Sequence, residues 1–406
     1  MKSNKITYLI FGSTLIIVLL NLVSLIFPTL LISITIGSQS RTNPFEVGAW
    51  LVPLVSVNIF ILFFGFMYYK GILPKKIKNS FHFILDFEVS KKVSLIIFTI
   101  IIGGYIIFTA NELTLNELDV FKDWIYIQKV LDNYPHNVNE EGFEELQILY
   151  VKNFLLFSSQ EVFQNVKVIP FFASILLISL TYFFTVKISN KRFSGLVSMI
   201  ILIQSNTFLR YDTSATFSNF WSLFYVLSLY LIYKKWTLSP LLFIASIFSK
   251  PLTLLFLPMT FLITLRSRLP SKTIVGILIS YVLIIVVMLA ILFLNVESGY
   301  SKNLTNFNYS DFWSSFSAWA FQLRIDGLVL LFLLPLTVGL FLKSRQGHRG
   351  SESILILLGG ILLSAPLLAA FTEFNIQPYR WIPLITFFAI GVGTLLSKFS
   401  VERSED

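Results

Sequence analysis

The residues best suited to take part in a reaction are carboxylates in one polar stretch, residues 111–166. This stretch holds ten of the chain's 22 acidic residues beside three lysines, although the net charge of the chain is +9. The ten are Glu112, Glu117, Asp119, Asp123, Asp132, Glu140, Glu141, Glu144, Glu145 and Glu161. A carboxylate that is partly shielded from water can have a raised pKa and act as a general base. We expect such chemistry from the early carboxylates, whereas the run from Glu140 to Glu145 is typical of a solvated surface.

Apolar segments make up most of the remaining chain and must position this stretch. The sequence is 55% hydrophobic and 13% charged, with a mean hydropathy of +0.77. Soluble domains have about a quarter of their residues charged. Repeated apolar runs of about 18–22 residues match the roughly 30 Å hydrocarbon core of a bilayer. Backbone groups in lipid must be hydrogen-bonded internally, so these runs predict an all-α, polytopic integral membrane protein.

We expect about twelve transmembrane helices, with two short ones inside 237–266, where Ser249-Lys250-Pro251 breaks the helical pattern. The other expected spans are about 7–36, 49–69, 93–110, 167–187, 193–209, 217–233, 273–294, 327–342, 353–370 and 380–397. This layout predicts a two-helix N-terminal extension (1–92), a membrane domain (93–397) and a tail (398–406).

The acidic stretch is expected to contain interfacial helices. Val120, Trp124, Ile127 and Leu131 recur at spacings of four, three and four, which indicates one face of a helix. With an indole on its apolar face, such a helix would lie along the lipid headgroups. Residues 146–163 are half apolar and predict a second interfacial or re-entrant helix.

Basic residues set the expected orientation. Lysines concentrate in 70–92, and smaller basic clusters recur in later loops. The positive-inside rule places these loops and both termini in the cytoplasm of a multi-pass cell-membrane protein, with outer loops at 111–166 and 295–326. This topology explains the excess of basic over acidic residues, so we expect no nucleic-acid partner. The expected environment of the chain is the lipid bilayer. The chain has no cysteine and three scattered histidines, so no dedicated metal site is expected.

Four segments follow one another in a recognisable order. NELDVFKDWIYIQKVL (116–131) is a helix within an acidic loop, and 168–235 alternates helices with a basic turn and a short outer loop. ASIFSKPLTLLFLPMTFLITL (245–265) has a lysine-containing break, and QPYRWIPLITFFAIGVGTLL (377–396) has an arginine before a proline-containing helix. Together they resemble the membrane glycosyltransferases of the C superfamily (GT-C fold), in particular the dolichyl-phosphate-mannose protein mannosyltransferase and aminoarabinose-transferase-like branch. The resemblance covers roughly two thirds of the chain, and residues 1–92 fall outside it.

The resemblance implies transfer of a sugar, with inversion, from a polyprenyl-phosphate donor to a protein or lipid-linked glycan on the extracytoplasmic face. We expect no cofactor, and the sequence does not determine whether a divalent metal is required. Asp119 matches the family's first acidic residue and would be the general base. The second family acid is replaced by Val120, which makes Glu117 a candidate substitute. A further family acid aligns near Ala215, with Asp212 as the nearby candidate.

Sugar transfer also needs cations that hold the negative charge developing on the departing phosphate. Arg380 and Lys250 stand at expected outer ends of helices, and Arg210 is a third candidate. Each cation could instead snorkel to the headgroups, and Asp119 could belong to a solvated helix face. Two other functions remain open: a transporter or flippase for a lipid-linked intermediate, and a non-catalytic GT-C-like subunit of a membrane complex. A transporter predicts inverted repeats and charges within spans, and neither is evident in the sequence.

Overall fold

The structure, a computed structural model, describes residues 4–31, 43–138, 140, 143–267, 269–294, 306–372 and 377–397. Regular structure in these ranges is helical throughout, and no strand occurs in them. The all-α class predicted from the sequence is therefore confirmed. The expected tail 398–406 lies outside the described residues, as do 32–36 of the first expected span and 295–305 of the second expected outer loop.

Six helices in the described part of the chain are long and apolar enough to cross a membrane. They are α1 (Asn4–Ile26), α3 (Leu51–Lys70), α5 (Lys91–Thr109), α10 (Val168–Ser189), α18 (Gly327–Arg345) and α19 (Arg349–Phe371). Other apolar helices are α11 (Arg192–Ile203), α13 (Phe220–Ile232), α14 (Ser239–Ser249), α15 (Leu257–Arg266), α16 (Ser271–Leu294) and α20 (Ile382–Leu395). This architecture is compatible with a membrane protein, because a helix satisfies its own backbone groups in lipid.

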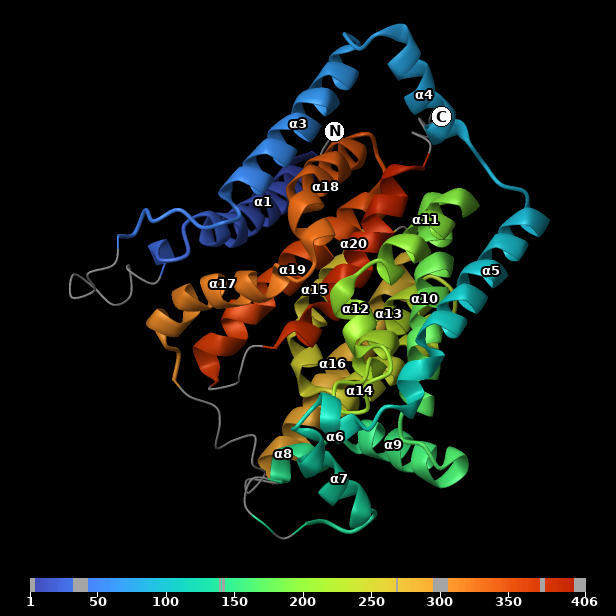
Figure 1. Cartoon of the computed structure of the whole chain (residues 1–406), viewed down its shortest axis with the longest axis vertical. Helices are drawn as coiled ribbons and strands as arrows, with labels where there is room; N and C mark the ends of the chain where they lie inside the picture. Colours follow the sequence, from blue (N-terminus) through green and yellow to red (C-terminus); the bar gives the residue numbers. More distant parts are fainter. Residues whose placement is uncertain are drawn as a thin grey trace.

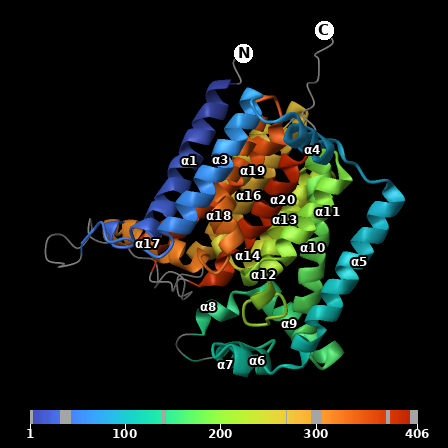
Figure 2. The same cartoon turned by 45° about the horizontal axis from the view of Figure 1, so that its top comes forward.

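The remaining elements are short or polar and lie mainly at the two ends of the bundle. They are α4 (Lys75–Asp86), η2 (Ala110–Thr114), α6 (Glu117–Val120), α7 (Trp124–Asp132), α8 (Glu144–Gln147), α9 (Tyr150–Phe163), α12 (Asn206–Tyr211), η3 (Trp236–Leu238), η4 (Pro251–Phe256), α17 (Tyr309–Leu323) and η6 (Pro378–Trp381). Helices α6 to α9 gather at one end, and α4 lies at the other (Figures 1 and 2). We call these the acidic end and the basic end.

Helix α20 forms the centre of the bundle. Twelve of its 14 residues are buried, and it packs against α10, α11, α18 and α19. A Cβ atom on Gly393 would lie 2.0 Å from Ser198 Oγ and 2.5 Å from Ser194 O of α11. Glycine therefore allows these two helices to approach closely, as small residues do in membrane bundles.

Helices α3 and α5 lie on the outside, and α5 runs along one flank of the bundle (Figure 1). Both expose large apolar side chains, among them Phe60 (62%), Ile107 (79%) and Phe108 (73%). Contiguous apolar surface of this kind is rare on soluble monomers and suits contact with lipid. Helix α1 packs against α17, α18 and α19, and α3 packs against α18, so these two helices dock on the C-terminal part of the chain.

Three local features bear on the sequence predictions. The break at Lys250 is confirmed: α14 ends at Ser249, Lys250 is extended, and η4 starts at Pro251. The basic segment 70–92 contains the helix α4, and the expected second outer loop contains α17. The sequence predicts loops for both segments, because polar residues interrupt the apolar pattern of a short helix.

Candidate active site at the acidic end

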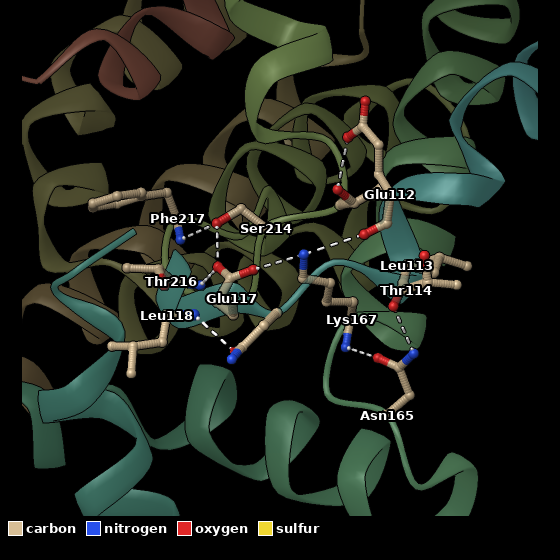
Figure 3. Close-up of polar contacts among 12 residues, drawn as sticks. Glu112, Leu113, Thr114, Glu117, Leu118, Asn165, Lys167, Ser214, Thr216 and Phe217 are labelled. Atoms are coloured by element: carbon tan, nitrogen blue, oxygen red, sulfur yellow. Dashed lines mark hydrogen bonds and ion pairs between the residues drawn. The ribbon is translucent and has the colours of Figure 1, made fainter. Parts of the chain in front are cut away.

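Glu117 is the most enclosed carboxylate of the acidic stretch. It begins the short helix α6, and its side chain is only 3% exposed. Its Oε1 accepts hydrogen bonds from Ser214 Oγ and from the Thr216 backbone N–H, both at 2.8 Å. Its Oε2 lies 3.3 Å from Lys167 Nζ (Figure 3). A buried carboxylate needs such partners, because an unpaired charge is costly away from water.

Lys167 ties the acidic stretch to the start of α10. It is 4% exposed, and its Nζ also donates to the backbone oxygen of Glu112 at 3.2 Å. Asn165 joins Lys167 to the acidic stretch: its Oδ1 accepts from the Lys167 backbone N–H, and its Nδ2 donates to Leu113 O (Figure 3). The Glu112 side chain accepts from Thr213 Oγ1 at 3.1 Å. The loop between α12 and α13 is thus held by two carboxylates of the acidic stretch.

Asp212 opens this loop and is 1% exposed. Tyr105 OH donates to its Oδ2 at 2.6 Å, and Ser174 Oγ donates to its backbone oxygen at 2.6 Å. Burial raises the pKa of the Asp212 carboxyl to about 7, and the nearby Glu112 adds to the effect. The hydrogen bond from Tyr105 works in the opposite direction, because it stabilises the ionised form.

Lys152 of α9 contacts the same loop. Its side chain is 8% exposed, and its Nζ donates to Thr216 O at 2.6 Å. Burial lowers the pKa of Lys152 to about 8, and the charge of Lys250 lowers it further, whereas Tyr379 and Glu117 work against this shift. Lys152 and Glu117 thus bind the same residue of the loop, Lys152 through the Thr216 oxygen and Glu117 through the Thr216 N–H.

A second group of polar side chains, formed by Lys250, Tyr379 and Arg380, lies beside the 212–217 loop. Lys250 occupies the break between α14 and η4 and donates a hydrogen bond to Tyr379 OH. The Tyr379 ring stacks on Phe217 with centroids 4.5 Å apart, which connects this group to the 212–217 loop. Burial acts to raise the pKa of Tyr379, but Lys250 and Arg380 outweigh it and bring the pKa to about 7. The phenol is therefore an unusually acidic oxygen between two cations.

A cavity of about 350 Å³ lies beside the pair of Glu117 and Lys167. Trp124 supplies an indole to its wall. Hydrogen-bonding side chains supply most of the rest, namely Asn116, Gln128, Asp132, Gln160, Gln164 and Asn165. An aromatic surface with several amides and carboxylates can bind a ligand that has both apolar faces and many hydroxyl groups.

The predicted site residues are distributed unequally. Glu117 accepts a hydrogen bond from the 212–217 loop, and Asp212 is the first residue of that loop. The group of Lys250 and Arg380 contacts the loop through Tyr379. Asp119, two residues after Glu117, is exposed. Trp124 and Ile127 form the buried face of α7 as predicted, but Val120 lies outside that helix and is 47% exposed.

Arg210, the third predicted cation, is exposed at the end of α12, with its guanidinium 5.9 Å from the ring of Tyr211. Sequence reasoning missed Lys152, Lys167 and Tyr379. Lys167 directly follows the acidic stretch, and Tyr379 precedes the predicted Arg380, so position in the sequence offered a weak signal for both. Within the described ranges, no group of three or more histidine or acidic residues could hold a metal ion.

The fold and the site define an all-helical chain with membrane-compatible apolar helices and a buried network of carboxylates and cations at one end. Comparison with protein-family models, with curated proteins and with solved structures finds no match for this chain.

Proposed function

We propose that this chain is a membrane glycosyltransferase that moves a sugar from a polyprenyl-phosphate donor to an acceptor at the acidic end. The observation that carries the proposal is the junction at the 212–217 loop. Carboxylates from 112–117, the lysine of α9, the lysine at the helix break and the Tyr379–Arg380 pair all converge there. Glycosyl transfer from a lipid phosphate needs this combination of a base and cations beside a bilayer surface.

The proposed donor site is the group of Lys250, Tyr379 and Arg380. The donor phosphate would lie against Lys250 and Arg380, which stabilise the charge that develops as it departs. Arginine suits this role because its planar fork can bind two phosphate oxygens at once. The exposed apolar surface of the outer helices would leave the polyprenyl chain in lipid while the phosphate enters from the side.

Asp119 is the proposed general base, because it is exposed and close in sequence to the enclosed Glu117. The acceptor hydroxyl oxygen would attack the anomeric carbon while Asp119 takes the hydroxyl proton. The bond from that carbon to the phosphate oxygen would break, and the polyprenyl phosphate would leave with the electron pair. The cavity beside Trp124 and Gln128 has the chemistry to hold a sugar.

The proposed topology has twelve crossings. The six long helices would be joined by α11, α13, α14, α15, α16 and α20, with both chain termini at the basic end. The acidic end would then face outward and the lysines of α4 inward, as the positive-inside rule requires. A helix of 10 to 14 residues is short for a bilayer, so η3, η4 and η6 would extend α14, α15 and α20.

A non-catalytic lipid-phosphate-binding subunit is the second candidate. The three interactions of Glu117 favour it, because they make that carboxylate a structural support and leave Asp119 as the exposed member of the pair. Such a protein would keep the donor site of Lys250 and Arg380 but would not transfer sugar.

The test is incubation of the purified full-length chain in liposomes with a panel of labelled polyprenyl-phosphate sugars and candidate peptide or glycan acceptors. We expect acceptor-dependent release of polyprenyl phosphate for one donor. Arg380→Ala should weaken use of that donor by about tenfold or more, since a charge-assisted hydrogen bond is lost. Arg380→Lys should recover part of this loss. Donor binding without any transfer would support the non-catalytic candidate, and absence of both would overturn the proposal.

A further inference from the structure

A larger cavity, of about 870 Å³, lies at the basic end. It forms where the ends of α10, α13 and α15 meet the beginnings of α11 and α19. Its wall is polar and basic, with Lys187, Asn190, Lys191, Arg192, Arg266, Gln346, His348 and Arg349 among its members. It is therefore separate from the candidate active site, which occupies the opposite end of the bundle.

The charge of this wall is strongly unbalanced. Five lysines and arginines line the cavity, against Glu88 as the one carboxylate among the described lining residues. Glu88 is already engaged, because its Oε1 accepts from the Arg192 backbone N–H at 3.0 Å and lies 3.7 Å from Arg192 NH1. Glu88 thus caps the beginning of α11 and neutralises little of the remaining positive charge.

Besides Arg192, two further cations of the wall have structural partners. Lys191 is 4% exposed, and its Nζ donates to Ile84 O, Leu85 O and Leu396 O. Arg266 binds Glu352 through Nε and NH2, at 3.1 and 2.9 Å. Lys187 and Arg349 are both exposed at the cavity wall, where Arg349 NH1 donates to the Arg266 backbone oxygen at 3.4 Å. These two side chains can turn toward a ligand without breaking a buried ion pair.

The beginning of α19 adds hydrogen-bond donors to the same wall. His348 is the N-cap residue, and its Nδ1 accepts from the Ser351 N–H at 3.1 Å. With Nδ1 accepting, the proton of a neutral ring is on Nε2, which becomes a donor. A Cβ on Gly350 would lie 2.2 Å from Ile188 Cγ2, so glycine brings the first turn of α19 against the end of α10. The positive end of the α19 dipole therefore opens beside Lys187.

We propose that this basic cavity binds a phosphate-bearing anion, held by Lys187, Arg192 and Arg349 together with the first turn of α19. Its volume accommodates a group of the size of pyrophosphate or a phosphorylated headgroup. A membrane-surface position allows two sources of the same chemistry, a lipid headgroup or a water-soluble phosphate compound. This inference does not depend on the glycosyltransferase proposal.

The test uses the full-length chain in nanodiscs of phosphatidylcholine, with inorganic pyrophosphate as the probe and isothermal titration calorimetry as the readout. Wild type should bind pyrophosphate saturably, and added salt should weaken the binding. Lys187→Gln and Arg349→Gln should each raise the Kd by about tenfold, because a charge-assisted hydrogen bond is lost. Lys235→Gln is the matched control, since Lys235 is also an exposed lysine at the basic end but does not line the cavity.

A second set of nanodiscs containing phosphatidic acid distinguishes the two sources. If a lipid headgroup occupies the cavity, these discs will raise the apparent Kd for pyrophosphate in wild type. If the ligand is soluble, the Kd will be the same in both discs; either result supports the site. Absence of saturable binding in neutral discs would overturn the proposal. So would an equal loss in Lys235→Gln, provided that all variants keep the wild-type elution profile.

Discussion

Both ends of the bundle bury lysines. Lys152 at the acidic end donates to a backbone oxygen, as the buried lysines of the basic end do, but Lys167 has a carboxylate partner. At the acidic end, Lys167 faces the carboxylate of Glu117. At the basic end, Lys191 and Lys343 donate to backbone oxygens at the C-terminal ends of helices, including Leu396 O for Lys191 and Thr394 O for Lys343. The first arrangement is a buried ion pair between distant segments, and the second is a charged cap that complements a helix dipole.

This difference explains why each end can carry a different chemistry. At the acidic end, Glu117 offsets the buried charge of Lys167, and Glu112 and Glu117 hold the 212–217 loop by hydrogen bonds. At the basic end, the buried lysines donate to backbone carbonyl oxygens and not to carboxylates. Their positive charge therefore adds to that of the cavity wall. The following variants test this comparison, from the largest expected effect to the smallest.

Asp119→Asn tests the catalytic half of the comparison. The change keeps the size of the side chain but removes the proposed base, so the rate of sugar transfer should fall by about 10²–10⁴-fold while donor binding survives. Asp123→Asn is the matched control, because Asp123 is a neighbouring exposed carboxylate with no proposed role. A transfer rate equal to wild type in Asp119→Asn would show that the base is elsewhere.

Glu117→Gln tests the structural half. It leaves Lys167 buried without its countercharge, which typically costs about 3–5 kcal/mol of unfolding free energy. Adding Lys167→Met should recover much of this loss, since the unpaired charge is then removed as well. Denaturant unfolding in detergent measures both variants. If Glu117→Gln instead keeps wild-type stability and loses transfer, Glu117 is a catalytic residue.

Lys343→Met is the corresponding change at the basic end. Here the loss is a set of hydrogen bonds to the end of α20, with no carboxylate left behind, so we expect a smaller cost of about 1–3 kcal/mol. The same unfolding measurement applies. A cost as large as that of Glu117→Gln would remove the distinction between the two kinds of buried lysine.

The pH dependence of Asp212 gives a further test of the acidic end. Its folded-state pKa of about 7 is above the ordinary pKa of 3.8 of an aspartate side chain, so the folded state binds more protons between these values. The contribution of Asp212 to stability is therefore fully present below about pH 4 and is lost as the pH rises through 7. Asp212→Asn should flatten this part of the stability profile in thermal unfolding at pH 5 and 7.5. An unchanged slope would mean that Asp212 is not protonated in the folded state.

The sequence was sufficient for the elements that depend on local pattern. The apolar runs predicted helices, and Ser249-Lys250-Pro251 predicted the break, because proline lacks the N–H that a helix interior needs. It was insufficient for α4 and α17, whose apolar faces alternate with polar residues. The pairing of Glu117 with Lys167 and Ser214 joins residues 50 and 97 positions apart, and no local pattern encodes such a contact.

We propose that the acidic and basic ends face opposite sides of a membrane, and cysteine labelling tests this orientation most directly. The chain contains no cysteine, so single introduced cysteines report their own positions without background. Asn137 near the acidic end and Lys76 of α4 are both exposed. In intact cells, a membrane-impermeant maleimide should label Asn137→Cys, whereas Lys76→Cys should be labelled only after lysis. Labelling of Lys76→Cys in intact cells, with Asn137→Cys protected, would contradict the orientation and remove the outward-facing active site.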